Sequence, residues 1–231
     1  MISIDPSYVL RERRVVSFGC SFVRGSHNDE NPNRANRVGT PTLLALKQQY
    51  HINTSGYNNG LETCFTSELG ELAKTSTNNL GIGGSGIRSA IYKALDYVEN
   101  DKNASNSYVI IGISELSRFD FIRPSIKHKW PKLSMEEYAK YYDKEDVISE
   151  IRMLLKLTYT YFSEIDIPIL FINTMNVNFS TKDIVPTFIF PNGSEYWRRY
   201  IESYDSSYAF EHPNVADHKH LARLLADKLL S

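Results

Sequence analysis

The chain has 231 residues, of which 42% are hydrophobic and 23% are charged, and its formal net charge is −1. This composition is ordinary for a globular protein, and the small net charge gives no general field that would favour nucleic acid or an anionic membrane as a partner. No apolar run is long enough to span a bilayer, the N-terminus lacks the apolar core of a secretion signal, and two cysteines make no disulfide framework. We therefore expect a single domain covering residues 1–231 in a reducing, cytoplasmic setting, with a virion or an exported particle left open.

Apolar runs alternate with helical patterns along the chain. Strands are predicted at 15–18, 77–80, 108–113 and 168–173, and helices at 40–50, 61–74, 87–99, 134–164 (with a break near Asp143) and from Pro213 to 230. Strands separated by helices predict an α/β protein in which a mostly parallel sheet is covered on both faces, a three-layer α/β/α fold. Ligands of such folds bind at the carboxyl ends of the strands. The best candidates for the walls of a binding site are therefore the loops 28–36, 117–133 and 176–197.

The sequence Gly19-Cys20-Ser21 directly follows the first predicted strand. A serine in this place can act as a nucleophile, although most serines just past a strand only cap the next helix. A nucleophilic serine also needs a base within hydrogen-bond reach and donors for the oxyanion. Cys20 is an alternative nucleophile, but a cysteine of this kind is more often a small buried side chain.

Four short segments together resemble the SGNH/GDSL hydrolase family and occur in the family's order. Residues 19–21 (Gly-Cys-Ser) are similar to its Gly-Asp-Ser block, and residues 79–84 (Asn-Leu-Gly-Ile-Gly-Gly) to its second block. Residues 112–115 (Gly-Ile-Ser-Glu) fall where the family has Gly-X-Asn-Asp, and residues 212–214 (His-Pro-Asn) are similar to its last block. The resemblance implies a flavodoxin-like SGNH hydrolase fold and a serine esterase.

The same resemblance assigns roles to individual residues. It implies that Ser21 is the nucleophile and His212 the base, and that Gly84 N–H, the Ser114 hydroxyl and Ser21 N–H hold the oxyanion. Ser114 replaces the family's asparagine. Ala209 stands where the family has an aspartate three residues before the histidine, so the usual third member of the triad is absent at that position.

The group that orients His212 has several candidates. Glu211 and Asp205 are nearby carboxylates, and a Ser–His dyad oriented by a backbone carbonyl is an equal alternative. We expect hydrolysis of a small acyl ester, with O-deacetylation of a carbohydrate as one candidate, and no cofactor or metal. The partner would be a small-molecule or glycan ester. The alternative function is a catalytically weakened protein of this fold that serves as a binding or structural module.

Other motifs admit different readings. Residues 81–86 formally match the dinucleotide motif G-x-G-x-x-G, but they follow the second predicted strand, and no acidic strand end lies about 20 residues further on. His218 and His220 could suggest a metal site, but residues two apart on a helix face different directions. We expect His218 to pack near the helix start and His220 to be solvated. Trp130 and Trp197 are weaker candidates for stacking against a sugar.

Overall fold

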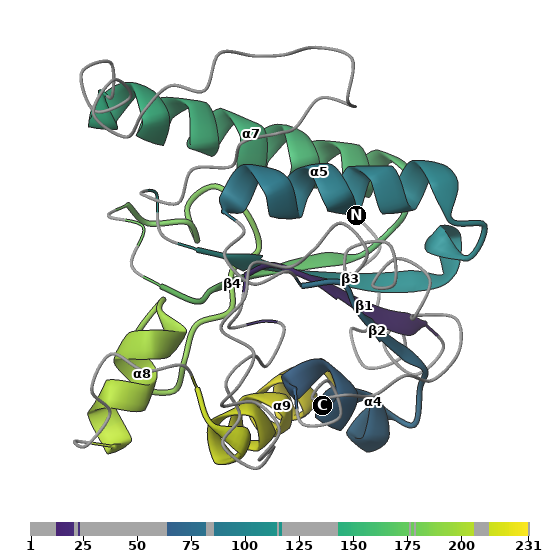
Figure 1. Cartoon of the computed structure of the whole chain (residues 1–231), viewed down its shortest axis with the longest axis vertical. Helices are drawn as coiled ribbons and strands as arrows, with labels where there is room; N and C mark the ends of the chain where they lie inside the picture. Colours follow the sequence, from purple (N-terminus) through teal and green to yellow (C-terminus); the bar gives the residue numbers. More distant parts are fainter. Residues whose placement is uncertain are drawn as a thin grey trace, which may run out of the picture.

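A computed structural model describes residues 13–20, 23, 64–81, 86–114, 116, 143–175, 177, 179–205 and 213–230. In these residues four parallel strands form one sheet in the order β2-β1-β3-β4 (Figure 1). The strands are β1 (Arg14–Phe18), β2 (Thr77–Asn79), β3 (Ser107–Ile113) and β4 (Ile169–Asn173). All four predicted strands are therefore confirmed, as is their parallel arrangement.

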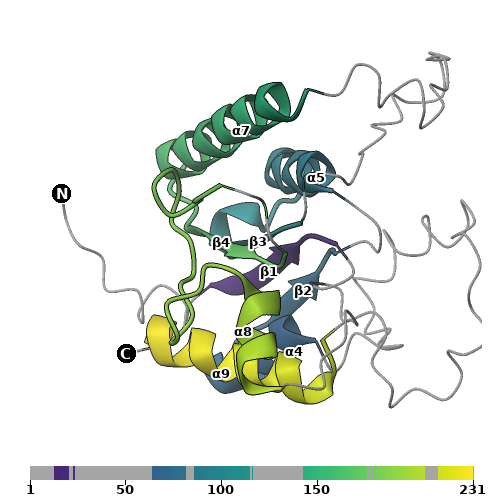
Figure 2. The same cartoon turned by 90° about the vertical axis from the view of Figure 1, so that its left-hand side faces the viewer.

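Helices cover both faces of this sheet. They are α4 (Phe65–Ala73), α5 (Ile87–Asn100), α7 (Lys144–Glu164), α8 (Trp197–Tyr204) and α9 (Val215–Leu230), with a short 3-10 turn, η2 (Ala104–Asn106). Figure 2 shows α5 and α7 above the sheet and α4 and α9 below it. The three-layer α/β/α prediction is confirmed.

The alternation of side chains along the strands divides the core in two. In β3, Ile110 joins the cluster beneath α4 and α9, whereas Val109 and Ile111 join the cluster beneath α5 and α7. Every residue of β3 is buried. A strand covered on both faces has no polar side to alternate with the apolar one, which is why this strand is the longest unbroken run of Val and Ile.

Most helix predictions agree with the structure over the described residues. The predicted break near Asp143 is the start of α7, because the Asp143 carboxylate accepts hydrogen bonds from the backbone N–H groups of Glu145 and Asp146. The predicted helix at 40–50, residues 61–63 and residues 134–142 lie outside the described residues. None of the described helices has the length and apolarity needed to cross a membrane.

The helix α8 has no counterpart among the predicted elements. It is short, and only Trp197 and Ile201 are buried on it. Its N-cap residue, Tyr196, makes no side-chain capping hydrogen bond. A single i,i+4 apolar pair without a cap gives too weak a periodic signal to predict a helix.

Part of the segment that follows β4 covers the open edge of that strand. Thr187 and Tyr196 form isolated parallel bridges to Phe171 and Asn173. The Phe188 N–H donates to the Phe171 carbonyl at 2.8 Å. An uncovered strand edge would expose unpaired backbone groups. Much of the segment 176–197, which was expected to form a wall of the binding site, thus has a structural role.

We predict that Arg88 and Glu150 couple α5 to α7 by about 0.5–1 kcal/mol at neutral pH, as a well-formed surface ion pair does. Arg88 Nε donates to Glu150 Oε1 at 2.9 Å, and this hydrogen bond holds the pKa of the Glu150 carboxyl below its ordinary value of 4.5. The stabilisation is therefore present above the unfolded-state pKa and is lost as the pH falls through the lower folded-state pKa.

A double-mutant cycle with Arg88→Gln and Glu150→Gln isolates this coupling from the other contacts of each side chain. Urea unfolding of the four proteins would be measured at pH 7 and in acid. A coupling of zero at pH 7, or one that is unchanged in acid, would contradict the prediction.

Candidate active site

The sheet has a switch point between β1 and β3. The chain leaves β1 to form β2 on one side and later returns to form β3 on the other side. In open α/β sheets, ligands bind outside the carboxyl ends of the strands at such a point. Gly19 and Cys20 follow β1 there, and Ser114 follows β3; Cys20 is 0% exposed and Ser114 is 1% exposed.

The side chain of Val23 packs between the ends of β1 and β3. A Cβ atom placed on Gly19 or on Gly112 would collide with Val23 Cγ2. Gly19 also has a positive φ of 154°, which side chains other than glycine rarely adopt. The two glycines therefore allow residue 23 to approach the sheet closely at the switch point.

The end of β2 is held to the same residue. Asn79 Nδ2 donates to the Val23 carbonyl at 2.9 Å, and Asn79 Oδ1 accepts from the Gly81 N–H at 3.0 Å. The Leu80 N–H donates to the Ser17 carbonyl at 2.8 Å, which continues the pairing with β1. The ends of β1, β2 and β3 thus meet around Val23.

Thr174, directly after β4, connects this junction to the fourth strand. Its hydroxyl donates to the Ile113 carbonyl at 2.9 Å, and its N–H donates to the same oxygen at 2.9 Å. Cys20 Sγ lies 3.7 Å from Thr174 Oγ1. Because the hydroxyl proton of Thr174 is given to Ile113, the Cys20 thiol is the donor in this contact.

The first turn of α4 joins β1 to the start of α9. Thr66 Oγ1 lies 2.7 Å from Ser17 Oγ, and the Phe65 N–H donates to His218 Nδ1 at 3.2 Å. The other end of α4 lies beside the start of β1, where Thr75 Oγ1 donates to the Arg13 carbonyl at 2.7 Å. The start of α9 therefore lies at the carboxyl side of the sheet.

The structure describes two of the residues predicted for the site. Ser114 is the buried residue after β3, and Asp205 is the C-cap of α8, where its N–H donates to the Ile201 carbonyl. The other four, Ser21, Gly84, Glu211 and His212, lie outside the described residues, as does Ala209. Their roles remain predictions.

The side chains of His218, His220 and Trp197 all pack against neighbouring aromatic rings. His218 is 0% exposed and packs against Phe65 and Trp197, as expected. The prediction of a solvated His220 is wrong, because its Nε2 lies 2.9 Å from the Tyr200 hydroxyl and its ring stacks on the Tyr200 ring. Trp197 is 1% exposed, so it is not available for stacking against a sugar. Trp130 lies outside the described residues.

The structure also bears on the two cysteines and on the metal site considered from the sequence. Cys20 and Cys64 are buried and are not paired in a disulfide, in keeping with the reading of small buried side chains. Within the described part of the chain, no three histidine, cysteine or acidic side chains are grouped so that they could hold a metal ion.

Sequence reasoning missed the contacts that hold this region together. The sequence gives no signal for the packing of Val23 against Gly19 and Gly112 or for the contact between Cys20 and Thr174. In each case the partners come from different parts of the chain. One missed feature did have a signal. Asn214 and Asp217 have the spacing of a capping box, and they form one at the start of α9.

Comparisons with known proteins identify the fold. No family model matches the chain, and no curated protein sequence matches it. The chain is similar to LAE5, an alpha/beta hydrolase enzyme from the metagenome of Lake Arreo, with a TM-score of 0.52 and 15% identity over 95% of this chain and 96% of that one. This likeness shows that the two proteins share a fold.

Two further solved structures match less well. A protein described as a lipolytic member of the G-D-S-L family from Desulfitobacterium hafniense has a TM-score of 0.48 and 12% identity, over 94% of this chain and 99% of that chain. Axe2, an acetylxylan esterase from Geobacillus stearothermophilus, has a TM-score of 0.46 and 12% identity, over 94% of each chain.

We predict that Gly112→Ala destabilises the protein by about 1–3 kcal/mol, the usual cost of overpacking a core. The new methyl group would collide with Val23 Cγ2, and the rigid ends of β1 and β3 leave that side chain little room to move. The free energy of unfolding in urea measures the effect. Val23→Ala removes the colliding atom, so the double variant should be less destabilised than the two single effects added together. Simple additivity would contradict a direct collision.

Proposed function

We propose that this protein is a serine ester hydrolase, a divergent member of the SGNH/GDSL family, in which Ser21 is the nucleophile and His212 the base. The observation that carries the proposal is the junction of strand ends around Val23. It fixes the chain just before and just after Ser21 at the switch point where ligands of this fold class bind.

The described residues on either side of Ser21 are tightly packed. Cys20 is buried against Thr174, and Val23 is seated between Gly19 and Gly112. The residues before and after Ser21 are therefore held at the carboxyl ends of β1 and β3. A nucleophile on a fixed turn is held in a reactive geometry without an entropic cost at the moment of reaction.

The start of α9 supports the assignment of the base. His212 is joined by one peptide bond to Pro213, and α9 begins two residues later at Val215. The first turns of α9 and α4 are linked by the hydrogen bond from the Phe65 N–H to His218 Nδ1. The beginning of α9 therefore lies on the carboxyl side of the sheet, as does the end of β1, which Ser21 follows in the sequence.

The oxyanion would be held by backbone and side-chain donors from three segments. Ser21 N–H would come from the residues that follow β1 in the sequence, and Gly84 N–H from those between Gly81 and Gly86, the N-cap of α5. The Ser114 hydroxyl comes from the end of β3. The partial positive charge at the start of α5 would add to the field that favours the oxyanion.

The orientation of His212 is assigned to a carboxylate or to a backbone carbonyl. Asp205 ends α8 and Glu211 precedes the histidine directly, so both lie on the connection between α8 and α9. A Ser–His dyad oriented by a carbonyl needs neither of them. The pH profile and kcat of Asp205→Asn and Glu211→Gln would distinguish these alternatives.

The reaction proceeds through an acyl-enzyme. His212 takes the proton of the Ser21 hydroxyl while Ser21 Oγ attacks the ester carbonyl carbon, and the resulting oxyanion is held by the three donors. The C–O bond to the alcohol then breaks, and His212 returns the proton to the leaving oxygen. Water, deprotonated by His212, attacks the acyl group, and Ser21 leaves with the proton.

We assign the substrate to the class of small acyl esters, with an O-acetyl group on a carbohydrate as the leading candidate. The loops expected around the site are polar, as suits a polar substrate such as a carbohydrate better than a long acyl chain. A small acyl group needs only a shallow apolar pocket, whereas the sugar can be bound by polar side chains.

We predict that the wild-type protein hydrolyses 4-nitrophenyl acetate and that Ser21→Ala abolishes this activity, because the nucleophile is lost. Activity should fall in acid, because a protonated imidazole cannot accept the proton of the serine. A fluorophosphonate should label Ser21 and not Cys20, as located by mass spectrometry.

Ser149→Ala serves as the control, since Ser149 is exposed on α7, on the face of the sheet opposite to α9. If the wild type and Ser21→Ala hydrolyse the ester at the same background rate, the proposed serine esterase activity is excluded. The binding or structural module then becomes the better explanation.

We predict that Ser114→Ala lowers kcat by on the order of 100-fold with little change in KM, as the loss of one oxyanion donor does in other hydrolases. The steady-state kinetics of the nitrophenyl ester measure this. A rise in KM at constant kcat would assign Ser114 to substrate binding instead. An unchanged kcat and KM would remove Ser114 from the site.

A further inference from the structure

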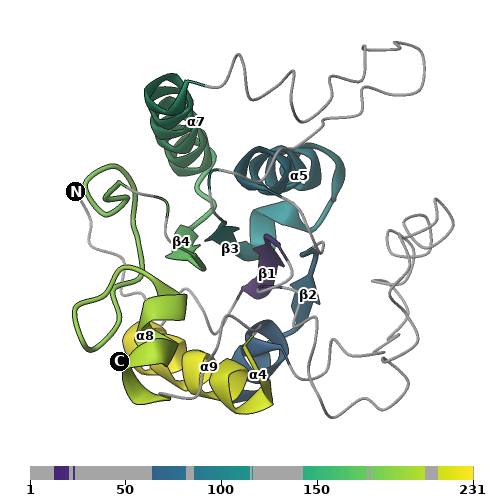
Figure 3. The same cartoon turned by 60° about the vertical axis from the view of Figure 1, so that its left-hand side comes forward.

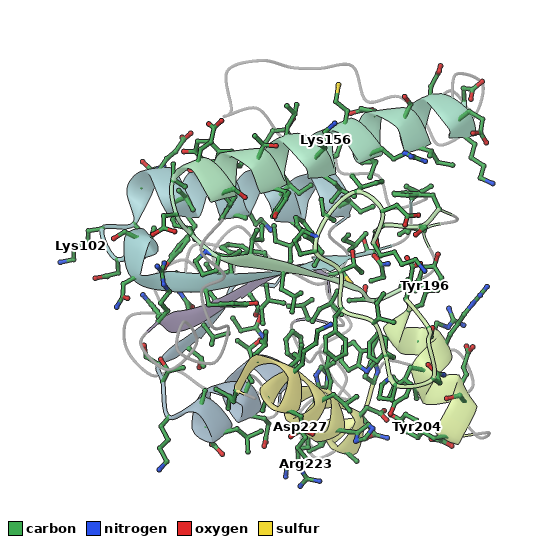
Figure 4. All side chains as sticks on the ribbon, turned by 180° about the vertical axis from the view of Figure 1, so that it is seen from behind. Lys102, Lys156, Tyr196, Tyr204, Arg223 and Asp227 are labelled. Atoms are coloured by element: carbon green, nitrogen blue, oxygen red, sulfur yellow. The ribbon has the colours of Figure 1, made fainter. Side chains whose placement is uncertain are left out.

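The helices α8 and α9 are joined at the two ends of the segment that carries His212. Tyr204 is the last residue of α8, and its hydroxyl donates to Asp217 Oδ1, in the first turn of α9, at 2.7 Å. The chain between these helices includes His212. Figures 1 and 3 show α8 beside α9, and Figure 4 labels Tyr204 on α8 next to α9.

Asp217 is held in place by hydrogen bonds at the start of α9, independently of Tyr204. Its Oδ2 accepts from the Asn214 N–H at 2.8 Å, while its own N–H donates to Asn214 Oδ1 at 3.0 Å. This reciprocal pair is a capping box, and the negative charge stands at the positive end of the helix. Asp217 is only 3% exposed, so both of its oxygens need partners, and Tyr204 supplies the second.

Tyr204 is a dependable donor in this pair. Burial, the hydrogen bond to Asp217 and the Asp217 charge all raise the pKa of the Tyr204 hydroxyl above its ordinary value. The hydroxyl therefore keeps its proton throughout the pH range of any ester assay. The ring is also held in place, because it packs edge-on against Tyr200 and His220.

A second tyrosine makes a similar bond one turn away. Tyr200 Oη lies 2.9 Å from His220 Nε2, so it too joins α8 to α9. The Tyr200 ring stacks on Phe190 at 4.9 Å and on His220 at 5.7 Å between centroids. Tyr200 lies further than Tyr204 from the end of α8, and His220 lies further than Asp217 from the start of α9. It offers a matched control for Tyr204.

We propose that Tyr204 and Asp217 are positioning residues for the base, because their hydrogen bond fixes both ends of the segment that carries His212. The proposal rests on the proposed function, in which His212 takes the proton of Ser21. A base displaced by even 1 Å loses much of its effect. The Tyr204–Asp217 pair would thus act on catalysis without touching the substrate.

The test compares Tyr204→Phe with Tyr200→Phe. Each variant loses one hydroxyl bond between α8 and α9 and keeps its ring. We expect Tyr204→Phe to lower kcat for 4-nitrophenyl acetate by roughly 10-fold to 100-fold at an unchanged KM, while Tyr200→Phe leaves both constants near the wild-type values. Labelling of Ser21 by the fluorophosphonate should slow in parallel with kcat.

A readout that does not depend on activity accompanies the kinetics. Amide hydrogen exchange in residues 205–214 should become faster in Tyr204→Phe and stay unchanged in Tyr200→Phe. Asp217→Asn should have the same effects as Tyr204→Phe, since it weakens the acceptor of the same bond.

The outcomes separate the two proposals. Unchanged exchange, or equal losses of kcat in Tyr204→Phe and Tyr200→Phe, would overturn the positioning role while a Ser21-dependent activity stands. Activity that survives Ser21→Ala would overturn the proposed function and, with it, the role of Tyr204 and Asp217 in catalysis. A selective loss of kcat in Tyr204→Phe, with faster exchange, supports both.

Discussion

The close approach of Val23 to the sheet is the constraint on which the rest of the candidate site depends. Only glycine at positions 19 and 112 leaves room for Val23 Cγ2, and the Val23 carbonyl in turn holds Asn79 at the end of β2. The segments proposed to carry the nucleophile and the oxyanion donors all start from this junction. A tightly packed junction has few alternative arrangements, so the groups built on it need little reorganisation during a reaction.

On one face of the sheet, a series of contacts links β1 to the helices near the end of the chain. Ser17 of β1 contacts Thr66 of α4, and the neighbouring Phe65 binds His218 of α9. The pair of Tyr204 and Asp217 then joins α9 to α8. The last helix is thereby placed relative to the first strand, and this is the relation that a Ser21–His212 pair requires. The opposite face, with α5 and α7, contributes the second half of the core.

The surroundings of Cys20, just after β1, suit a neutral side chain. Cys20 is 0% exposed, and its Sγ lies 3.7 Å from the neutral hydroxyl of Thr174. A carboxylate in the same place would lose its hydration, which is costly unless a partner compensates for it. A thiol needs only one weak acceptor. The neutral contact between Cys20 and Thr174 therefore braces the turn in a manner suited to its buried surroundings.

Hydrophobic periodicity and capping residues were enough to predict the strands, most of the helices and the parallel sheet, because these signals act within a few positions of the chain. The sequence also puts Ser114 directly after a predicted strand, where the structure has it, while its role in the site stays a prediction. The folded structure was needed to show that α8 is a helix, that His220 contacts Tyr200, and that Val23 and Tyr204 hold the junctions. Each of these features depends on partners from different elements. Local sequence carries no record of such partners, because close packing brings them together only in the folded protein.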